Sequence, residues 1–143
     1  MPYRFVDTAP TADVGFVAEG ADLDACFTAA CVATLATMLD NPESLRAVVE
    51  RPLRVEAESL DLLLLRLLEE LVFYKDAEHL FLAVDAVHVG GGDGAWQATA
   101  MGRGEAVDRS RHRLAADVKA VTLHGLAVEA SSAGWRASVV LDI

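Results

Sequence analysis

The segment from Leu60 to Leu71 contains eight leucines, and this apolar concentration limits the possible folds more than any other feature. Asp61, Arg66, Glu69 and Glu70 interrupt it, so it falls short of the roughly 18 uninterrupted apolar residues that a membrane span needs. At helical spacing, six of the leucines share one wide face: 60, 63, 64, 67, 68 and 71. We therefore expect a core helix that begins after the capping residue Ser59 and ends near Asp76.

The rest of the chain predicts one more helix and several strands. Asp22 is a plausible N-cap for a helix that ends at Asn41-Pro42. Alternating or β-rich runs predict strands at 3–7, 14–20, 51–58, 81–89, 95–101, 118–123, 126–130 and 135–143. We expect an α+β fold: a two-layer domain with two helices packed on a mixed, largely antiparallel sheet of about eight strands. No linker or repeat interrupts the chain, so residues 1–143 are expected to form a single domain.

Charge and composition exclude several classes of protein. The chain carries 22 acidic and 12 basic side chains, which gives a net charge of −10, and this excludes general attraction to nucleic-acid phosphates. An apolar content of 53% argues against a disordered chain. The N-terminal residues lack the apolar core of a signal peptide, and two cysteines are too few for a disulfide framework. We expect a cytoplasmic protein that does not contact membranes.

Two motifs that resemble binding sites are better explained as structure. The glycine-rich run Gly90–Gly94 lies between two predicted strands and opens no helix, so it predicts a hairpin turn rather than a phosphate-binding loop. Cys26 and Cys31 are five residues apart on a helix, about 140° around its axis. That placement does not suit a shared metal ion, and both are expected to be small core residues.

Two features leave structural and functional interpretations open. Five potential cations lie between residues 103 and 113: Arg103, Arg109, Arg111, His112 and Arg113. They form either a solvated, charge-balancing loop or a docking patch for RNA or an acidic partner. His124, at the turn before Gly125, is either structural or functional.

Two aspartates near the ends of the chain are candidate metal ligands. Asp13 lies at a break between the first two predicted strands. Asp142 lies on the less apolar face of the last strand, beside the terminal carboxylate of Ile143. Carboxylate oxygens are hard donors that suit calcium, magnesium or manganese.

Three separated blocks resemble the archease family in the same order along the chain. They are Thr11-Ala-Asp-Val-Gly15, Asp117-Val-Lys-Ala-Val-Thr-Leu-His-Gly-Leu126 and Val140-Leu-Asp-Ile143. The resemblance covers essentially the whole chain. It departs from the family pattern at Pro10, where members typically carry histidine, and at Leu123, where they carry tyrosine.

The resemblance implies a function and a set of site residues. Archeases are non-enzymatic activators of the RtcB-type RNA ligase, which promote ligase guanylylation and multiple turnover in tRNA splicing, with an indirect association with tRNA. By resemblance, Asp13 and Asp142 bind a divalent metal, helped by Ile143, and Lys119 contributes to activation. His124 is a further activation candidate. If both aspartates bind one ion, they should lie close together in space.

Two other functions are weighed against this activator. One is a chaperone-like binding partner of RNA-modifying enzymes such as a tRNA methyltransferase, which retained binding without metal would favour. The other is a small metal-dependent phosphohydrolase, for which the chain offers no clear base, nucleophile or second metal site.

Overall fold

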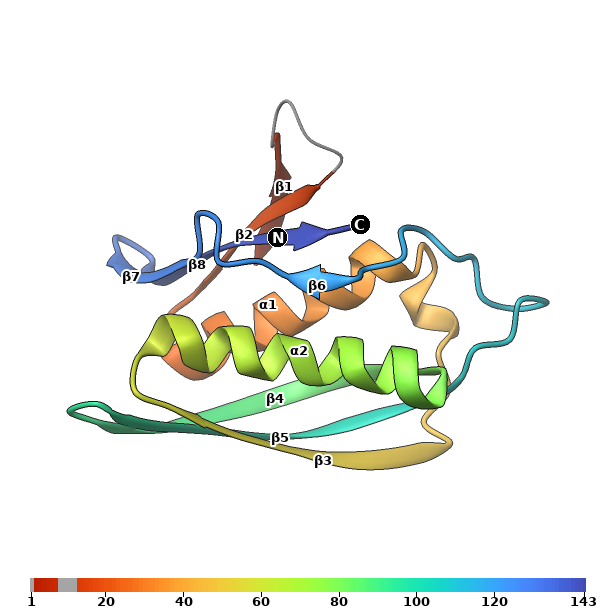
Figure 1. The fold of residues 1–143 in the computed structure, drawn as a ribbon, viewed down its shortest axis with the longest axis horizontal. Coiled ribbons are helices and arrows are strands. Elements are labelled where there is room, and N and C mark those ends of the chain that lie inside the picture. The colour runs from red at the N-terminus through yellow and green to blue at the C-terminus, as the bar shows by residue number, and fades with distance from the viewer. Residues whose placement is uncertain (1, 8–12) are drawn as a thin grey trace.

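Two antiparallel sheets enclose a layer of two helices in the computed structural model, which describes residues 2–7 and 13–143 (Figure 1). The helices are α1 (Leu23–Met38) and α2 (Leu60–Glu78), and a short 3₁₀ turn, η1, spans Pro42–Ser44. The strands are β1 (Tyr3–Val6), β2 (Val14–Gly20), β3 (Val49–Ala57), β4 (Leu80–Gly92), β5 (Ala95–Ala106), β6 (Ala120–Val121), β7 (Ala127–Ser131) and β8 (Gly134–Asp142). The predicted α+β class, with two helices and eight strands, is confirmed.

The strands divide between two sheets, whereas one mixed sheet was expected. One sheet has the order β1-β2-β8-β6, with β7 also paired to β8, and the other has the order β3-β5-β4. Every ladder among the described strands is antiparallel. Both helices contact both sheets, so the molecule has a sheet–helix–sheet arrangement in place of the two layers expected.

The burial of α1 explains why two sheets are needed. Its buried residues run through the whole helix: Cys26, Phe27, Ala29, Ala30, Cys31, Ala33, Thr34, Leu35, Thr37 and Met38. A helix that is apolar on most of its circumference must be covered on more than one side. β2 and β8 cover it from one sheet, and β4 covers it from the other.

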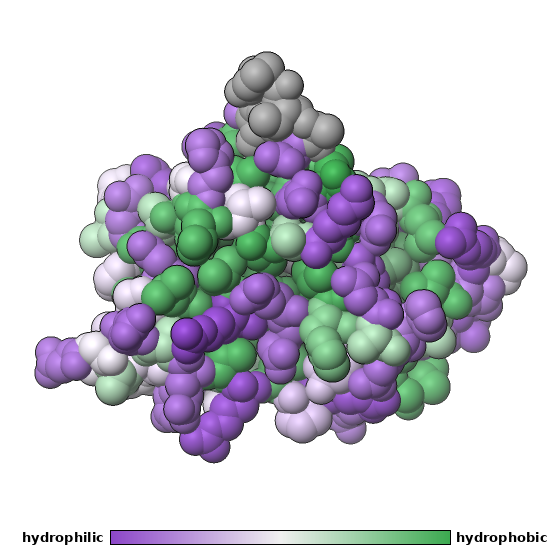
Figure 2. All heavy atoms as spheres, in the orientation of Figure 1, coloured by the Kyte–Doolittle hydropathy of each residue, from purple (hydrophilic) through white to green (hydrophobic). Residues whose placement is uncertain are grey.

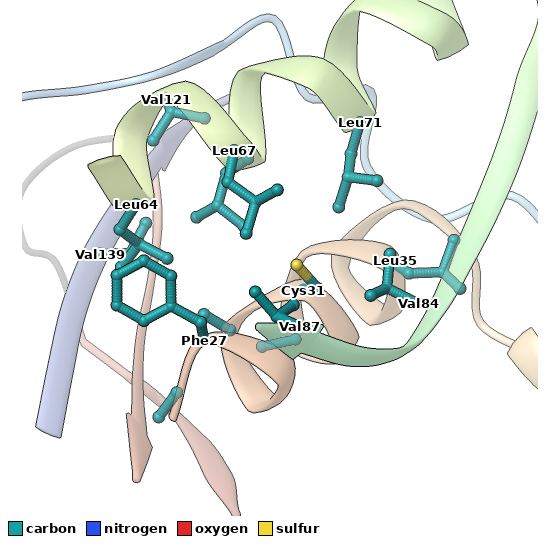
Figure 3. Packing of buried hydrophobic residues seen from close by; sticks show 14 of the residues in the cluster. Phe27, Cys31, Leu35, Leu64, Leu67, Leu71, Val84, Val87, Val121 and Val139 are labelled. Carbon is teal, nitrogen blue, oxygen red and sulfur yellow. The ribbon is translucent and has the colours of Figure 1, made fainter. Parts of the chain in front are cut away.

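The leucine-rich helix α2 closes the core from the other side of α1. Its buried face contains Leu63, Leu64, Leu67, Leu68 and Leu71, five of the six leucines predicted for it. Figure 3 shows Leu64, Leu67 and Leu71 pointing toward α1 residues, with valines of both sheets around them. In the part of the chain that the structure covers, no helix is long and apolar enough to cross a membrane.

Local signals in the sequence are confirmed at the helix starts, the hairpin and the cysteines. The Asp22 carboxylate accepts a hydrogen bond from the Ala25 N–H at 2.8 Å, and Ser59 caps α2 in the same way. The glycine-rich run ends β4 and turns at Asp93-Gly94 into β5, as a hairpin turn requires. Cys26 and Cys31 are buried free thiols, and burial raises the pKa of Cys31 to about 12.

Candidate metal centre

The register between β2 and β8 brings the two candidate aspartates to the same place. Val14 lies opposite Leu141 in this antiparallel ladder. Continued by one residue, the register sets Asp13 opposite Asp142. Directly opposed residues of an antiparallel pair have Cα atoms about 4.5–5.5 Å apart. The continued register therefore predicts that these two residues, far apart in sequence, lie close together just beyond the end of the ladder.

Because buried and half-buried side chains alternate along β8, Asp142 lies on the face of the sheet that points away from the core. Ala137, Val139 and Leu141 are buried, whereas Asp142 is half-buried, as is Asp13. Successive side chains of a strand point to opposite faces. The carboxylate of Asp142 therefore belongs to the outer face, where water and ions have access.

A third segment of chain meets the same point from the other side of β8. Ala120 of β6 pairs with Asp142, and the Lys119 N–H donates to the Asp142 carbonyl at 2.8 Å. Asp142 thus lies between Asp13 on one neighbouring segment and Lys119-Ala120 on the other. The hydrogen bond from Lys119 fixes the backbone of Asp142 on the β6 side.

The chain end is part of this edge. Ile143 is half-buried and packs against the hydrophobic core, which continues the buried face of β8. Its terminal carboxylate follows Asp142 directly. Figure 1 shows the C-terminus beside the start of β2.

The donor set at this edge fits a hard divalent cation. Asp13, Asp142 and the terminal carboxylate of Ile143 supply only oxygen atoms, the donors that calcium and magnesium take. Within residues 2–7 and 13–143, no group of three or more His, Cys, Asp or Glu side chains is arranged to hold a metal ion. Metal binding by Asp13, Asp142 and Ile143 therefore stays a prediction.

Lys119 lies beside the aspartate edge, because its backbone N–H donates to the Asp142 carbonyl. The residue is exposed and lines a groove along α2, together with Glu69, Phe73 and Asp76. Its contribution to activation stays a prediction.

The turn that follows β6 contains His124 and one of the two departures from the family pattern. The other departure lies outside the described residues. His124 is exposed in the turn that follows β6, and its neighbour Leu123 is 68% exposed. Pro10 lies outside the described residues, with the Thr11-Ala12 part of the first family block. Nothing in the structure assigns His124 a contact with Asp142.

Most of the cations between Arg103 and Arg113 contact carboxylates of the protein itself. Arg111 binds Glu105, and the buried His112 lies 3.1 Å from the same carboxylate. Arg103 binds Glu50. These three contacts favour the charge-balancing interpretation of the segment over a docking patch for RNA or an acidic partner.

Glu105 is the centre of this buried cluster. Its carboxylate also accepts the Arg46 N–H at 2.8 Å. The guanidinium of Arg111, supported by the Arg46 N–H and by His112, outweighs burial and lowers the pKa of Glu105 to about 2. The carboxylate is therefore charged at any physiological pH and ties the 107–118 segment to β5.

A second buried cation was not anticipated from the sequence. Lys75, in the last turns of α2, is buried and contacts Asp76 at 2.8 Å and Asp117 at 2.6 Å. It also donates to the Val118 carbonyl, one residue before Lys119. Burial opposes its charge, but the two aspartates outweigh that effect and raise the pKa of Lys75. In the sequence, the only indication that Lys75 is buried is its position beside apolar residues at the end of α2.

Comparison with known proteins agrees with the geometry over the full chain. The family model described as Archease protein family matches residues 3–143. The protein archease of Archaeoglobus fulgidus is 36% identical over 146 residues, with 100% of both chains covered. The protein archease of Pyrococcus furiosus is 34% identical over 134 residues, with 93% of this chain and 94% of the relative covered.

Two solved structures have the same fold. The solution structure of Methanobacterium thermoautotrophicum protein 1598 superposes with a TM-score of 0.83 at 31% identity, over 99% of both chains. The crystal structure of a Thermotoga maritima archease, described as a possible chaperone, gives a TM-score of 0.52 at 9% identity, over 96% of this chain and 94% of that chain, which supports the fold alone. From the family match and the full-length relatives, the chain belongs to the Archease protein family.

Proposed function

We propose that this protein is a non-enzymatic, divalent-metal-binding activator of an RtcB-type RNA ligase, and that it promotes ligase guanylylation and multiple turnover in tRNA splicing and RNA repair. Membership of the Archease protein family supports the proposal. The observation that carries it is the β2–β8 register, whose last pair is Val14 and Leu141 and which, continued by one residue, brings Asp13 to Asp142. The sequence resemblance predicted the same two residues as ligands.

The carboxylates of Asp13 and Asp142 and the terminus of Ile143 would hold the ion. A bound divalent ion supplies charge that can offset the negative charge of a nucleotide phosphate. The protein's own contribution is positional. The β2–β8 ladder and the Lys119–Asp142 backbone hydrogen bond hold the two aspartates at one edge. The apolar packing of Ile143 against the core would keep this residue beside Asp142.

The activator role also agrees with the charge of the chain. A ligase that handles RNA is expected to carry basic surface, and a net charge of −10 favours association with such a partner. The same charge disfavours direct contact with RNA phosphates, so any association with tRNA would pass through the ligase.

The test is guanylylation of the ligase from the same organism under multiple-turnover conditions. Wild-type protein should accelerate it, and Asp13→Asn and Asp142→Asn should each remove most of that acceleration. Asp93→Asn, at the tip of the β4–β5 hairpin, is the matched control and should activate like wild type. Equal activation by all four proteins would overturn the proposal.

Metal dependence separates the activator from the chaperone-like alternative. Calorimetric titrations of wild-type protein with calcium, magnesium and manganese chloride should show binding that both asparagine variants lose. Activation should also disappear after the protein is treated with a chelator. Ligase binding and function that persist without metal would favour a partner-binding chaperone.

A further inference from the structure

A groove between α2 and β6 opens next to the aspartate edge. It has a volume of about 350 Å³, and its walls include Glu69, Phe73 and Asp76 from α2 and Lys119 and Val121 from the β6 segment. Val121 pairs with Leu141, the residue before Asp142. The groove therefore begins one strand away from the proposed metal site.

Phe73 is an aromatic side chain on the outer side of a helix whose leucines face inward. It is 53% exposed, and its ring contacts Tyr74 edge-on with centroids 5.2 Å apart. It also borders a second groove on α2, so it forms a ridge between the two. Figure 2 shows hydrophobic patches interrupted by hydrophilic side chains on the face that α2 and β6 form.

Two carboxylates lie one helical turn before this aromatic ring. Glu69 and Glu70 precede Phe73 by four and three residues, the spacings that put side chains on one helix face. Within the described residues neither glutamate forms an ion pair within 4 Å, whereas Asp76 is bound to Lys75. Glu69 thus lies beside the ring in the α2–β6 groove, across from Lys119, whereas Glu70 lies along the second groove with Arg54 and Arg66.

The exposed ring of Phe73 beside the carboxylate of Glu69 is a surface that an arginine side chain recognises. A guanidinium stacks on aromatic rings and forms paired hydrogen bonds with a carboxylate. RNA is a poor occupant, because phosphates are repelled by glutamates and by a chain of net charge −10. A basic protein segment satisfies both the ring and the charges.

We propose that the α2–β6 groove docks an arginine-bearing segment of the RNA ligase, with the guanidinium against Phe73 and Glu69. This docking surface rests on the proposed function, since it assumes that the ligase is the partner. It would hold the partner along α2 while the aspartate edge, one strand away, faces the ligase's reaction centre. Docking and metal binding are then separate tasks of adjacent surfaces.

The test measures the dissociation constant for purified ligase by calorimetry. Glu69→Lys reverses the charge and should weaken binding about 10-fold or more. Phe73→Leu keeps an apolar side chain but removes the ring, and should weaken binding about threefold to 10-fold. Glu43→Lys, an exposed charge reversal on η1, is the matched control and should bind like wild type. Wild-type binding should weaken as salt rises, less steeply for Glu69→Lys.

Activation assays on the same proteins separate this proposal from the proposed function. Glu69→Lys and Phe73→Leu should regain full activation at saturating concentration, whereas Asp142→Asn should bind normally and fail to activate. Wild-type activation together with unchanged affinity of both groove variants would overturn the docking surface and leave the activator role standing. Normal docking by wild type without any activation would overturn the activator role and leave the docking surface standing. Weakening by Glu43→Lys equal to that of Glu69→Lys would also overturn the groove, because net charge alone would explain it.

Discussion

Glu105 and Asp142 are carboxylates that the fold treats in opposite ways. Glu105 is buried, and Arg111, His112 and the Arg46 N–H satisfy it. Asp142 is half-buried on an outer face, where the register sets a second carboxylate opposite it. Like charges directly opposed in a sheet destabilise it. The comparison separates a charge that holds the structure together from a pair that we propose as ligands of an external cation.

The two lysines repeat this contrast. Lys75 is buried and binds two aspartates and a carbonyl, which joins the end of α2 to the start of the β6 segment. Lys119 is exposed on a groove wall, and no ion pair within 4 Å involves it among residues 2–7 and 13–143. Buried, fully satisfied charges therefore support the segment whose exposed charges remain available to a partner.

The largest expected effect is that of Glu105→Gln. An amide cannot balance the half-buried Arg111 and the buried His112, and removing one partner of a buried charged pair costs about 3 kcal/mol or more in the free energy of unfolding. Urea unfolding followed by circular dichroism measures it. The exposed Glu43→Gln is the control and should change the midpoint little. A loss below about 1 kcal/mol would mean that Glu105 is not the centre of the cluster.

Acid should weaken the same cluster in a defined range. The folded pKa of Glu105 is about 2 and its ordinary value is 4.5, so its folded pKa is depressed. Its contribution to stability is therefore complete above about pH 4.5 and is lost as the pH falls toward 2. The free energy of unfolding should decline across this range more steeply in wild type than in Glu105→Gln. Parallel pH profiles for the two proteins would contradict the assignment.

Lys75→Met should have an intermediate effect. The Val118 carbonyl loses its donor, while the exposed Asp76 and Asp117 are stabilised by water, so we expect a loss of about 1–2 kcal/mol. Hydrogen exchange should also speed up at the Lys119 amide, which in wild type is protected by its hydrogen bond to the Asp142 carbonyl. Lys119→Met is the matched control and should stay within about 0.5 kcal/mol of wild type. Equal losses for the two lysines would remove the distinction between them.

Local structure was predictable because its causes are local. The capping oxygens of Asp22 and Ser59, the leucine face of α2 and the alternation of β8 each act within a few residues. The division into two sheets was not predictable, since strand pairing depends on contacts between distant segments. The available signal in the sequence was the run of apolar and small side chains around most of α1, because a helix that is covered on most sides needs two layers around it.

The candidate site shows the same limit. The resemblance identified Asp13 and Asp142, and the register of β2 and β8 supplies the spatial reason. The charge balance of the basic segment was not assigned from sequence, although Glu105 lies only six residues before Arg111, because their contact depends on how the chain turns after β5.

The smallest expected effect has the opposite sign and bears most directly on the comparison. Without divalent ions, Asp142→Asn should raise the free energy of unfolding by about 0.5 kcal/mol, because a neutral amide no longer faces Asp13 across the ladder. Calcium should reverse the order, because an ion that binds only the folded protein stabilises wild type by mass action and the variant has lost a charged ligand. Thermal unfolding with and without calcium measures both, and Asp93→Asn should follow wild type in each. If calcium stabilises Asp142→Asn as much as wild type, the opposed carboxylates are not the ion's site. A loss of stability without metal would instead show that Asp142 supports the fold as Glu105 does.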